Sequence, residues 1–264
     1  MASEPFTYEG EDLDAMDLAD NYHDWILDRF EPLLGANVVE VGAGTGSFSR
    51  LIARRAAAKR LFLLEPSDAM AAQLADAARE ITDAETTTAV GFLDGLTAEV
   101  KAFEPDTFVY VNVLEHVEED AAEIQRVFDL LPAGGTLCAF VPALPFLYSK
   151  FDESIDHYRR YTLDDIAGKC EAAGFEVVER RYFDIVGILP WLIKFKLLGS
   201  TKLNPGAVGV YDRFVVPIMR RVESVIRLPI GKNALVVARK PAAATSTRPS
   251  GAGAGPQPPN IIAK

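Results

Sequence analysis

Short runs of apolar or β-branched residues alternate with stretches of helical periodicity along the first half of this chain. Continuous apolar runs are typical of strands that are buried on both faces of a parallel sheet. The stretches between them repeat apolar residues at helical spacing. The alternation of strand and helix therefore predicts a doubly wound α/β fold. The predicted strands are 37–41, 60–64, 86–92, 107–113 and 136–141.

Two further strands and several helices extend this pattern to residue 240. We predict strands at 175–181 and 234–239, separated by a long apolar and basic insertion at 184–232. The chain divides into an acidic N-terminal arm at 1–20, a folded domain at 21–240 and a disordered tail at 241–264, which is rich in Ala, Gly, Ser and Pro. The predicted helices are 47–58, 119–131 and 162–173, with others that start at 21 and 66.

The amino-acid composition indicates a folded globular protein rather than a disordered or membrane-spanning one. Of 264 residues, 49% are hydrophobic and 25% are charged, as in a folded globular domain. The longest apolar run, 185–193, is too short to span a bilayer, and we expect no secretory signal. Two cysteines, Cys138 and Cys170, fit a reducing, cytoplasmic setting. The three histidines lie far apart in the sequence, so we expect no metal site; they are His23, His116 and His157.

Charge is distributed unevenly along the chain. The net charge of −11 argues against a general nucleic-acid-binding protein. Residues 180–240 nevertheless contain 12 Lys or Arg and three acidic residues, a local balance of +9. This segment is either a solvated basic face or a surface that attracts an anionic substrate or a membrane.

A glycine-rich loop follows the first predicted strand and precedes a helix. Glycines at 42, 44 and 46 allow a tight turn and a close approach of a ligand to the backbone. A dinucleotide-binding loop requires glycine at the position of Ser47. Glu65 ends the next strand, where a carboxylate can accept hydrogen bonds from both hydroxyls of a ribose. These residues together indicate a cofactor that has a ribose and lacks a pyrophosphate.

Several segments resemble motifs of the class I S-adenosylmethionine-dependent methyltransferases. Val38–Gly46 is similar to their first motif, and Glu65 matches the acidic residue that binds the ribose. Asp94 in Gly91–Leu96 matches the residue that contacts the adenine. Further similarity lies in Asn112–Val117 and in the turn Pro132–Leu137. The resemblance implies a seven-stranded, mostly parallel sheet with an antiparallel last strand and a helical lid inserted before that strand.

The resemblance also implies roles for individual residues around S-adenosyl-L-methionine. The three glycines of the loop would pass under the methionine part, and Glu40 would brace the loop and favour the ammonium group. Glu65 would hold the ribose and Asp94 the adenine, with Phe92 or Leu93 framing it. Tyr22 would reach the cofactor or serve only helix packing. The implied cofactor-binding residues are Tyr22, Glu40, Gly42, Gly44, Gly46, Glu65, Asp94, Asn112 and Leu114, the last two near the sulfonium.

Candidate catalytic residues follow the fourth and fifth strands. His116 lies at the edge where ligands bind in such sheets, and imidazole can remove a proton near neutral pH. The polar stretch Asp156–Tyr161 contains His157 and Tyr158, which can bind or deprotonate a substrate. A subgroup of methyltransferases carries a similar stretch. In the alternative interpretation, its arginines pair with nearby acids such as Asp152.

The insertion at 184–232 bears on the methyl acceptor. Its apolar residues and interspersed Lys and Arg fit a lid over an apolar pocket, a membrane-surface helix or an oligomer face. We interpret the chain as a cytoplasmic S-adenosylmethionine-dependent methyltransferase that acts on an oxygen of a small molecule with an apolar or lipid-like part. The alternatives are an NAD-dependent oxidoreductase and a non-catalytic protein that retains the cofactor site.

Overall fold

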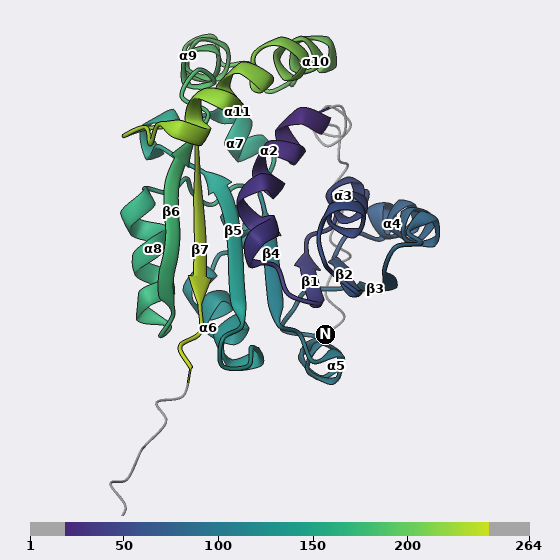
Figure 1. Ribbon diagram of the computed structural model, residues 1–264. Helices are drawn as coiled ribbons and strands as arrows, with labels where there is room; N and C mark the ends of the chain where they lie inside the picture. The colour runs from purple at the N-terminus through teal and green to yellow at the C-terminus, as the bar shows by residue number, and fades with distance from the viewer. Residues whose placement is uncertain (1–18, 243–264) are drawn as a thin grey trace, which may run out of the picture.

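The computed structural model describes residues 19–242 (Figure 1). A seven-stranded sheet forms its centre, in the order β3-β2-β1-β4-β5-β7-β6. All neighbouring strands are parallel except β7, which runs antiparallel to β5 and β6. The predicted sheet is thereby confirmed. The strands are β1 (Asn37–Val41), β2 (Arg60–Glu65), β3 (Glu85–Val90), β4 (Thr107–Val111), β5 (Thr136–Pro142), β6 (Glu176–Phe183) and β7 (Asn233–Arg239).

Helices cover both faces of the sheet, as a doubly wound fold requires. Successive residues of β1 point to opposite faces: Val39 belongs to the hydrophobic cluster that includes residues of α5, α6 and α8, whereas Val38 belongs to the cluster that includes residues of α2, α3 and α4. Both faces of the central strands are therefore buried, which explains their continuous apolar runs. The helices are α2 (Asp20–Phe30), α3 (Ser47–Arg55), α4 (Asp68–Glu80), α5 (Thr97–Phe103), α6 (Asp120–Leu130) and α8 (Leu163–Ala172).

Several predicted boundaries differ from the structure, and helices α5 and α7 (Lys150–Ser154) were not predicted. The helix predicted at 47–58 ends at Arg55, and the strand predicted at 175–181 is Glu176–Phe183. The strand predicted at 107–113 ends at Val111, because Asn112 adopts a left-handed conformation and the short helix η2 (Leu114–His116) follows. The strand predicted at 86–92 ends at Val90. Helix α5 was missed because only Val100 and Phe103 are buried on it, too few positions to produce a helical period.

The insertion between β6 and β7 is helical, as predicted. It contains α9 (Ile188–Trp191), the π-helix η4 (Leu192–Leu197), α10 (Pro205–Phe214) and α11 (Val216–Val225). Figure 1 shows these elements together at one end of the sheet. In the part of the chain that the structure describes, none of the helices is long and apolar enough to cross a bilayer. The predicted arm and tail lie outside the described residues, apart from 19–20 and 241–242.

Side chains of the insertion connect it to the body of the protein. The carboxylate of Asp212 on α10 accepts hydrogen bonds from the backbone amides of Asn21 and Tyr22 at the start of α2, at 3.2 and 2.9 Å. Asp184, fully buried at the start of the insertion, accepts a hydrogen bond from the hydroxyl of Tyr211 and pairs with Lys232 at 3.2 Å. The helical insertion is thus held at both ends against the sheet.

Candidate active site

The glycine loop between β1 and α3 lies at the carboxyl edge of the parallel strands, where ligands bind in folds of this type. Gly42, Gly44 and Gly46 have φ values of 70°, 56° and 81°, a region that side chains disfavour. A Cβ on Gly42 would lie 2.5 Å from Val113, and one on Gly46 would lie 2.9 Å from Ala77. At these two positions glycine therefore allows both the turn and close packing within the protein.

Glu65 ends β2 beside this loop and is 5% exposed. Its Oε2 accepts a hydrogen bond from the amide of Gly44, and its Oε1 accepts one from the amide of Ser67, each at 2.9 Å. A carboxylate offers about four acceptor positions, so about two remain for a diol. Burial raises the pKa of Glu65, and the two amide hydrogen bonds lower it. The protein thus fixes this carboxylate without using all of its acceptor capacity.

Glu40 lies on β1, directly before the glycine loop, and is buried. The hydroxyl of Ser49 on α3 donates a hydrogen bond to its carboxylate. Burial raises the pKa of Glu40 to about 8; the hydrogen bond from Ser49 acts against this, and the charge of Glu65 adds to it. At neutral pH, Glu40 is therefore mostly protonated when no cation lies beside it.

The other residues predicted to contact the cofactor have different surroundings. Asp94 lies on the exposed turn after β3, and its neighbour Phe92 is 54% exposed. Asn112 has a φ of 55°, and its amide donates a hydrogen bond of 2.8 Å to the carbonyl of Phe140. Leu114 is fully buried. Asn112 thus turns the chain at the carboxyl edge of β4, while Leu114 anchors the segment that follows.

Tyr22 lies on α2 and is buried against the start of the insertion and β7. Its hydroxyl lies 3.3 Å from Asp184 Oδ2 and 3.0 Å from Asn233 Oδ1. Its ring makes edge contacts with Trp25 and Phe183 at centroid distances of 5.7 and 6.1 Å. These contacts favour helix packing, the second of the two roles considered for Tyr22.

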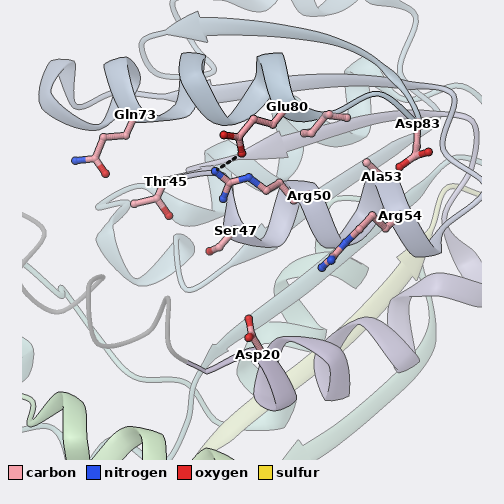
Figure 2. A pocket seen from close by; sticks show the side chains of 10 residues that line it. Asp20, Thr45, Ser47, Arg50, Ala53, Arg54, Gln73, Glu80 and Asp83 are labelled. Atoms are coloured by element: carbon pink, nitrogen blue, oxygen red, sulfur yellow. Dashed lines mark ion pairs between the residues drawn. The ribbon is translucent and has the colours of Figure 1, made fainter.

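A hollow of about 490 Å³ opens beside the glycine loop, between α3 and α4 (Figure 2). Arg50 and Glu80 form an ion pair of 3.4 Å at its wall. Glu65 does not line this hollow, so the hollow is distinct from the predicted ribose position. Its walls carry charges of both signs and do not select one class of ligand. They comprise Asp20, Thr45, Ser47, Arg50, Ala53, Arg54, Gln73, Glu80, Ile81 and Asp83.

Three side chains converge after the carboxyl end of β4. Glu115 and His116 come from η2, and His157 comes from the segment after β5. The two imidazole rings pack edge to face with centroids 4.5 Å apart, and Glu115 Oε1 lies 3.8 Å from His157 Nε2. One donor atom from each of the three residues lies within 4.8 Å of the others, a grouping that can hold a metal ion. The fold thus joins two histidines that the sequence keeps far apart.

Burial alters the acid–base chemistry of this group. It raises the pKa of the fully buried Glu115 to about 7, while the charges of His157 and Arg160 lower it. Burial and the neighbouring His157 lower the pKa of His116 to about 3, against hydrogen bonds to the backbone of Asp156 and Ile155. At neutral pH His116 is therefore a neutral imidazole and a weaker base than the sequence suggested.

Asp152 positions the segment that carries His157. It lies on α7 (Lys150–Ser154) and is fully buried. Its Oδ1 is 3.2 Å from His157 Nδ1 and accepts a hydrogen bond of 2.8 Å from Arg160 Nε. Arg160 therefore pairs with a nearby acid, as the alternative interpretation of this segment proposed for its arginines. Tyr158 is 53% exposed, and its amide, rather than its side chain, donates to the carbonyl of Glu115 at 2.8 Å.

Two residues of this site were missed from the sequence. Glu115 stands in the segment singled out for His116, and Asp152 was considered only as a partner of arginine. Their burial, which makes them chemically distinctive, arises from contacts between segments remote in the chain. The only available signal was that Glu115 adjoins His116 at the end of a predicted strand.

Comparisons with known proteins agree with this fold. The family model of the methyltransferase domain matches residues 16–180, more than half of the chain. The chain belongs to this family of class I S-adenosylmethionine-dependent methyltransferases. The match removes the nicotinamide-dependent oxidoreductase as an alternative. A comparison with curated proteins finds no match.

Solved structures with the same fold are distant in sequence. A chain from a Haloferax volcanii complex that contains the Trm112 methyltransferase activator has a TM-score of 0.58 at 16% identity, over 88% of this chain and 95% of that one. Phosphoethanolamine N-methyltransferase 2 of Haemonchus contortus, in complex with S-adenosyl-L-methionine, has a TM-score of 0.55 at 17% sequence identity, over 84% of this chain and 52% of that one. An S-adenosylmethionine-dependent methyltransferase of Archaeoglobus fulgidus has a TM-score of 0.53 at 14% identity, over 84% of this chain and 94% of that one. At these identities the similarity establishes the fold alone.

Proposed function

We propose that this methyltransferase transfers the methyl group of S-adenosyl-L-methionine to an oxygen of a small molecule with an apolar or lipid-like part, at the cytoplasmic surface of an anionic membrane. One observation carries the proposal. The carboxyl edge of the sheet, with Glu65 on one side, adjoins a helical insertion that exposes apolar and basic side chains on the other. The buried free thiols of Cys138 and Cys170 agree with a reducing compartment.

The residues at this edge fit the cofactor. Glu65 would hold the ribose through its two remaining acceptor positions, and Glu40 would favour the ammonium group of the methionine part. Asn112 would stand near the sulfonium, and Asp94 beside the adenine. The bound cofactor supplies a methyl group on a positively charged sulfur, which is already a strong methyl donor. The main task of the protein is therefore to orient the acceptor and to exclude water.

The acceptor side is connected directly to the insertion. Trp191 of α9 packs edge to face on Phe151 of α7 at a centroid distance of 5.3 Å. The guanidinium of Arg160 lies 4.5 Å from the ring centroid of Trp191 and 2.8 Å from Asp152. Any displacement of α9 therefore acts on the segment that carries His157. This connection supports a lid that positions the acceptor next to the histidine pair.

The outer face of the insertion suits an anionic lipid surface. Leu197 is 69% exposed, Phe214 61% and Ile218 62%, so apolar side chains point to solvent on η4, α10 and α11. Basic residues lie among them, including the exposed Arg213 and Arg221. A surface that combines apolar anchors with positive charge is typical of helices that lie in a membrane interface. We therefore favour a lipid-like acceptor over a free polar metabolite.

Radiolabelled methyl transfer tests the proposed function. Purified full-length protein is incubated with methyl-labelled S-adenosyl-L-methionine and a cellular lipid and metabolite extract. We expect label in the organic-soluble fraction, its loss with Glu65→Gln, and its retention with Glu85→Gln, a control at the opposite edge of the sheet. Mass spectrometry of the product then shows whether oxygen carries the methyl group. Cofactor binding without transfer to any fraction would favour a non-catalytic protein, and label confined to aqueous products would exclude a lipid-like acceptor.

A further inference from the structure

We propose that Glu115, His116 and His157 bind one divalent transition-metal ion, with Zn²⁺ as the best match. One carboxylate and two imidazoles form a ligand set common in catalytic zinc sites, and three protein ligands leave a coordination position for water or substrate. The donor atoms already lie within 4.8 Å of one another. Zinc ligands at about 2 Å from the ion stand about 3.3 Å apart in a tetrahedron, so small side-chain movements complete the site.

Glu115 lacks the partners that a buried carboxylate normally has. It is fully buried, and neither side-chain oxygen has a hydrogen-bond partner among the described residues. The 3.8 Å to His157 Nε2 is too long for a hydrogen bond. Leaving such a group unpaired in the protein interior is energetically unfavourable. A cation held between the carboxylate and the imidazoles removes this cost.

Asp152 orients His157 as the outer partner of a metal ligand does. Because an ionised carboxylate only accepts hydrogen bonds, Nδ1 of His157 carries the proton that faces Asp152, 3.2 Å away. In the neutral ring, Nε2 then carries a lone pair on the side of Glu115. Carboxylate–histidine pairs of this kind are the usual second layer of a metal site. Asp152 is itself fixed by hydrogen bonds from Arg160 and from the hydroxyl and amide of Ser149.

Among the described residues, the charged groups around the cluster leave Glu115 without a lysine or arginine partner. Asp152 pairs with the buried guanidinium of Arg160 at 2.8 Å. Asp120, another buried acid nearby, pairs with Lys169 at 2.6 Å and Arg159 at 3.0 Å. These basic groups are therefore engaged by other acids, and a divalent ion would give Glu115 a partner.

The site suggests how the acceptor is activated, a role that rests on the proposed function. A hydroxyl group bound to the open position of the ion loses its proton to solvent more easily, because the ion stabilises the oxygen anion. Acceptors that bind a metal through a hydroxyl oxygen then need no separate general base. The position of η2, which begins at Leu114 two residues after Asn112, places the ion on the acceptor side of the cofactor edge.

Metal binding can be measured without any methyl transfer. The full chain without a polyhistidine tag is freed of metal with a chelator and titrated with Zn²⁺ by calorimetry and with Co²⁺ by visible absorption. We expect one ion per chain and Co²⁺ bands typical of mixed nitrogen and oxygen ligands. Glu115→Gln and His116→Ala are expected to weaken binding by more than about tenfold, and Asp152→Asn by about 10- to 100-fold. His23→Ala is the control, because this third histidine packs on Phe48 at 5.6 Å, outside the cluster.

Each outcome decides the inference. Absence of Zn²⁺ binding to the wild-type chain overturns it, as does binding that persists in both Glu115→Gln and His116→Ala, which would locate the ion elsewhere, for example on the N-terminal acids. Thermal melts of the variants show that they fold. S-adenosylhomocysteine binding is measured on the same samples. If S-adenosylhomocysteine binds and Zn²⁺ does not, only the metal-site inference is wrong. If S-adenosylhomocysteine does not bind, the proposed function is wrong.

Discussion

Buried carboxylates define the chemistry at the scale of single residues. Glu65 is held by two backbone amides, so its role does not depend on a flexible side chain finding its ligand. Glu40 is buried with one hydroxyl donor, from Ser49. The motif predicted the places of both acids, whereas their burial and hydrogen bonds follow only from the packing of β1, β2 and the glycine loop.

The raised pKa of Glu40 predicts that cofactor binding releases a proton. Glu40 has a pKa of about 8, so it is mostly protonated at pH 7, and the ammonium group of the cofactor favours the carboxylate. We expect the affinity for S-adenosylhomocysteine to rise with pH toward 8, by at most about tenfold per pH unit. Calorimetry at pH 7 in two buffers of different ionisation enthalpy measures the released proton, which Glu40→Gln abolishes. Tight binding to the wild type with no proton released would contradict this role.

The same shift has a consequence for the unliganded protein. A carboxyl group whose pKa is raised on folding binds its proton more tightly in the folded state, so the stability it contributes is present below pH 4.5 and is lost as pH rises through 8. Glu223, whose pKa burial raises to about 7, acts in the same direction. As pH rises from 5 to 8, the loss of protons from these two groups therefore lowers the free energy of unfolding.

At the scale of elements, the insertion is amphipathic and anchored at both ends. Its inner side chains, such as Val216 and Met219, join the hydrophobic core, and Asp184 and Asp212 hold it by hydrogen bonds. Its outer side chains remain exposed. The sequence predicted this segment as apolar and basic, but the division into inner and outer faces depends on how α10 and α11 pack against α2.

Substitution of the exposed apolar residues is expected to reduce membrane binding. Phe214→Ser with Ile218→Ser removes two exposed anchors that belong to neither hydrophobic cluster of the core. We expect the wild type to sediment with vesicles that contain phosphatidylglycerol and the partition coefficient of the double variant to be lower by about a hundredfold, because burial of each apolar side chain contributes about 1.5 to 3 kcal/mol. Vesicles of phosphatidylcholine alone serve as the control. Equal sedimentation of both proteins with anionic vesicles would show that this face of the insertion does not bind the membrane.

At the scale of the whole molecule, the strand order creates the site. β1 lies between β2 and β4, so the glycine loop, Glu65 and Asn112 meet at one edge of the sheet. This much was predictable, because apolar strands and turn residues are local signals. The meeting of His116 with His157 was not, because it depends on contacts between the ends of β4 and β5 and the segment that follows, such as the bridge between Ala143 and Tyr161.

The most direct test of the account is the affinity of Glu65 variants for S-adenosylhomocysteine, measured by calorimetry on protein shown by thermal melting to be folded. Glu65→Gln removes the charge that accepts the ribose hydroxyls, so we predict an affinity lower by on the order of a hundredfold. Glu85→Gln, at the other edge of the sheet, should bind as the wild type does. Unchanged affinity in folded Glu65→Gln would contradict the central claim that this carboxylate holds the cofactor.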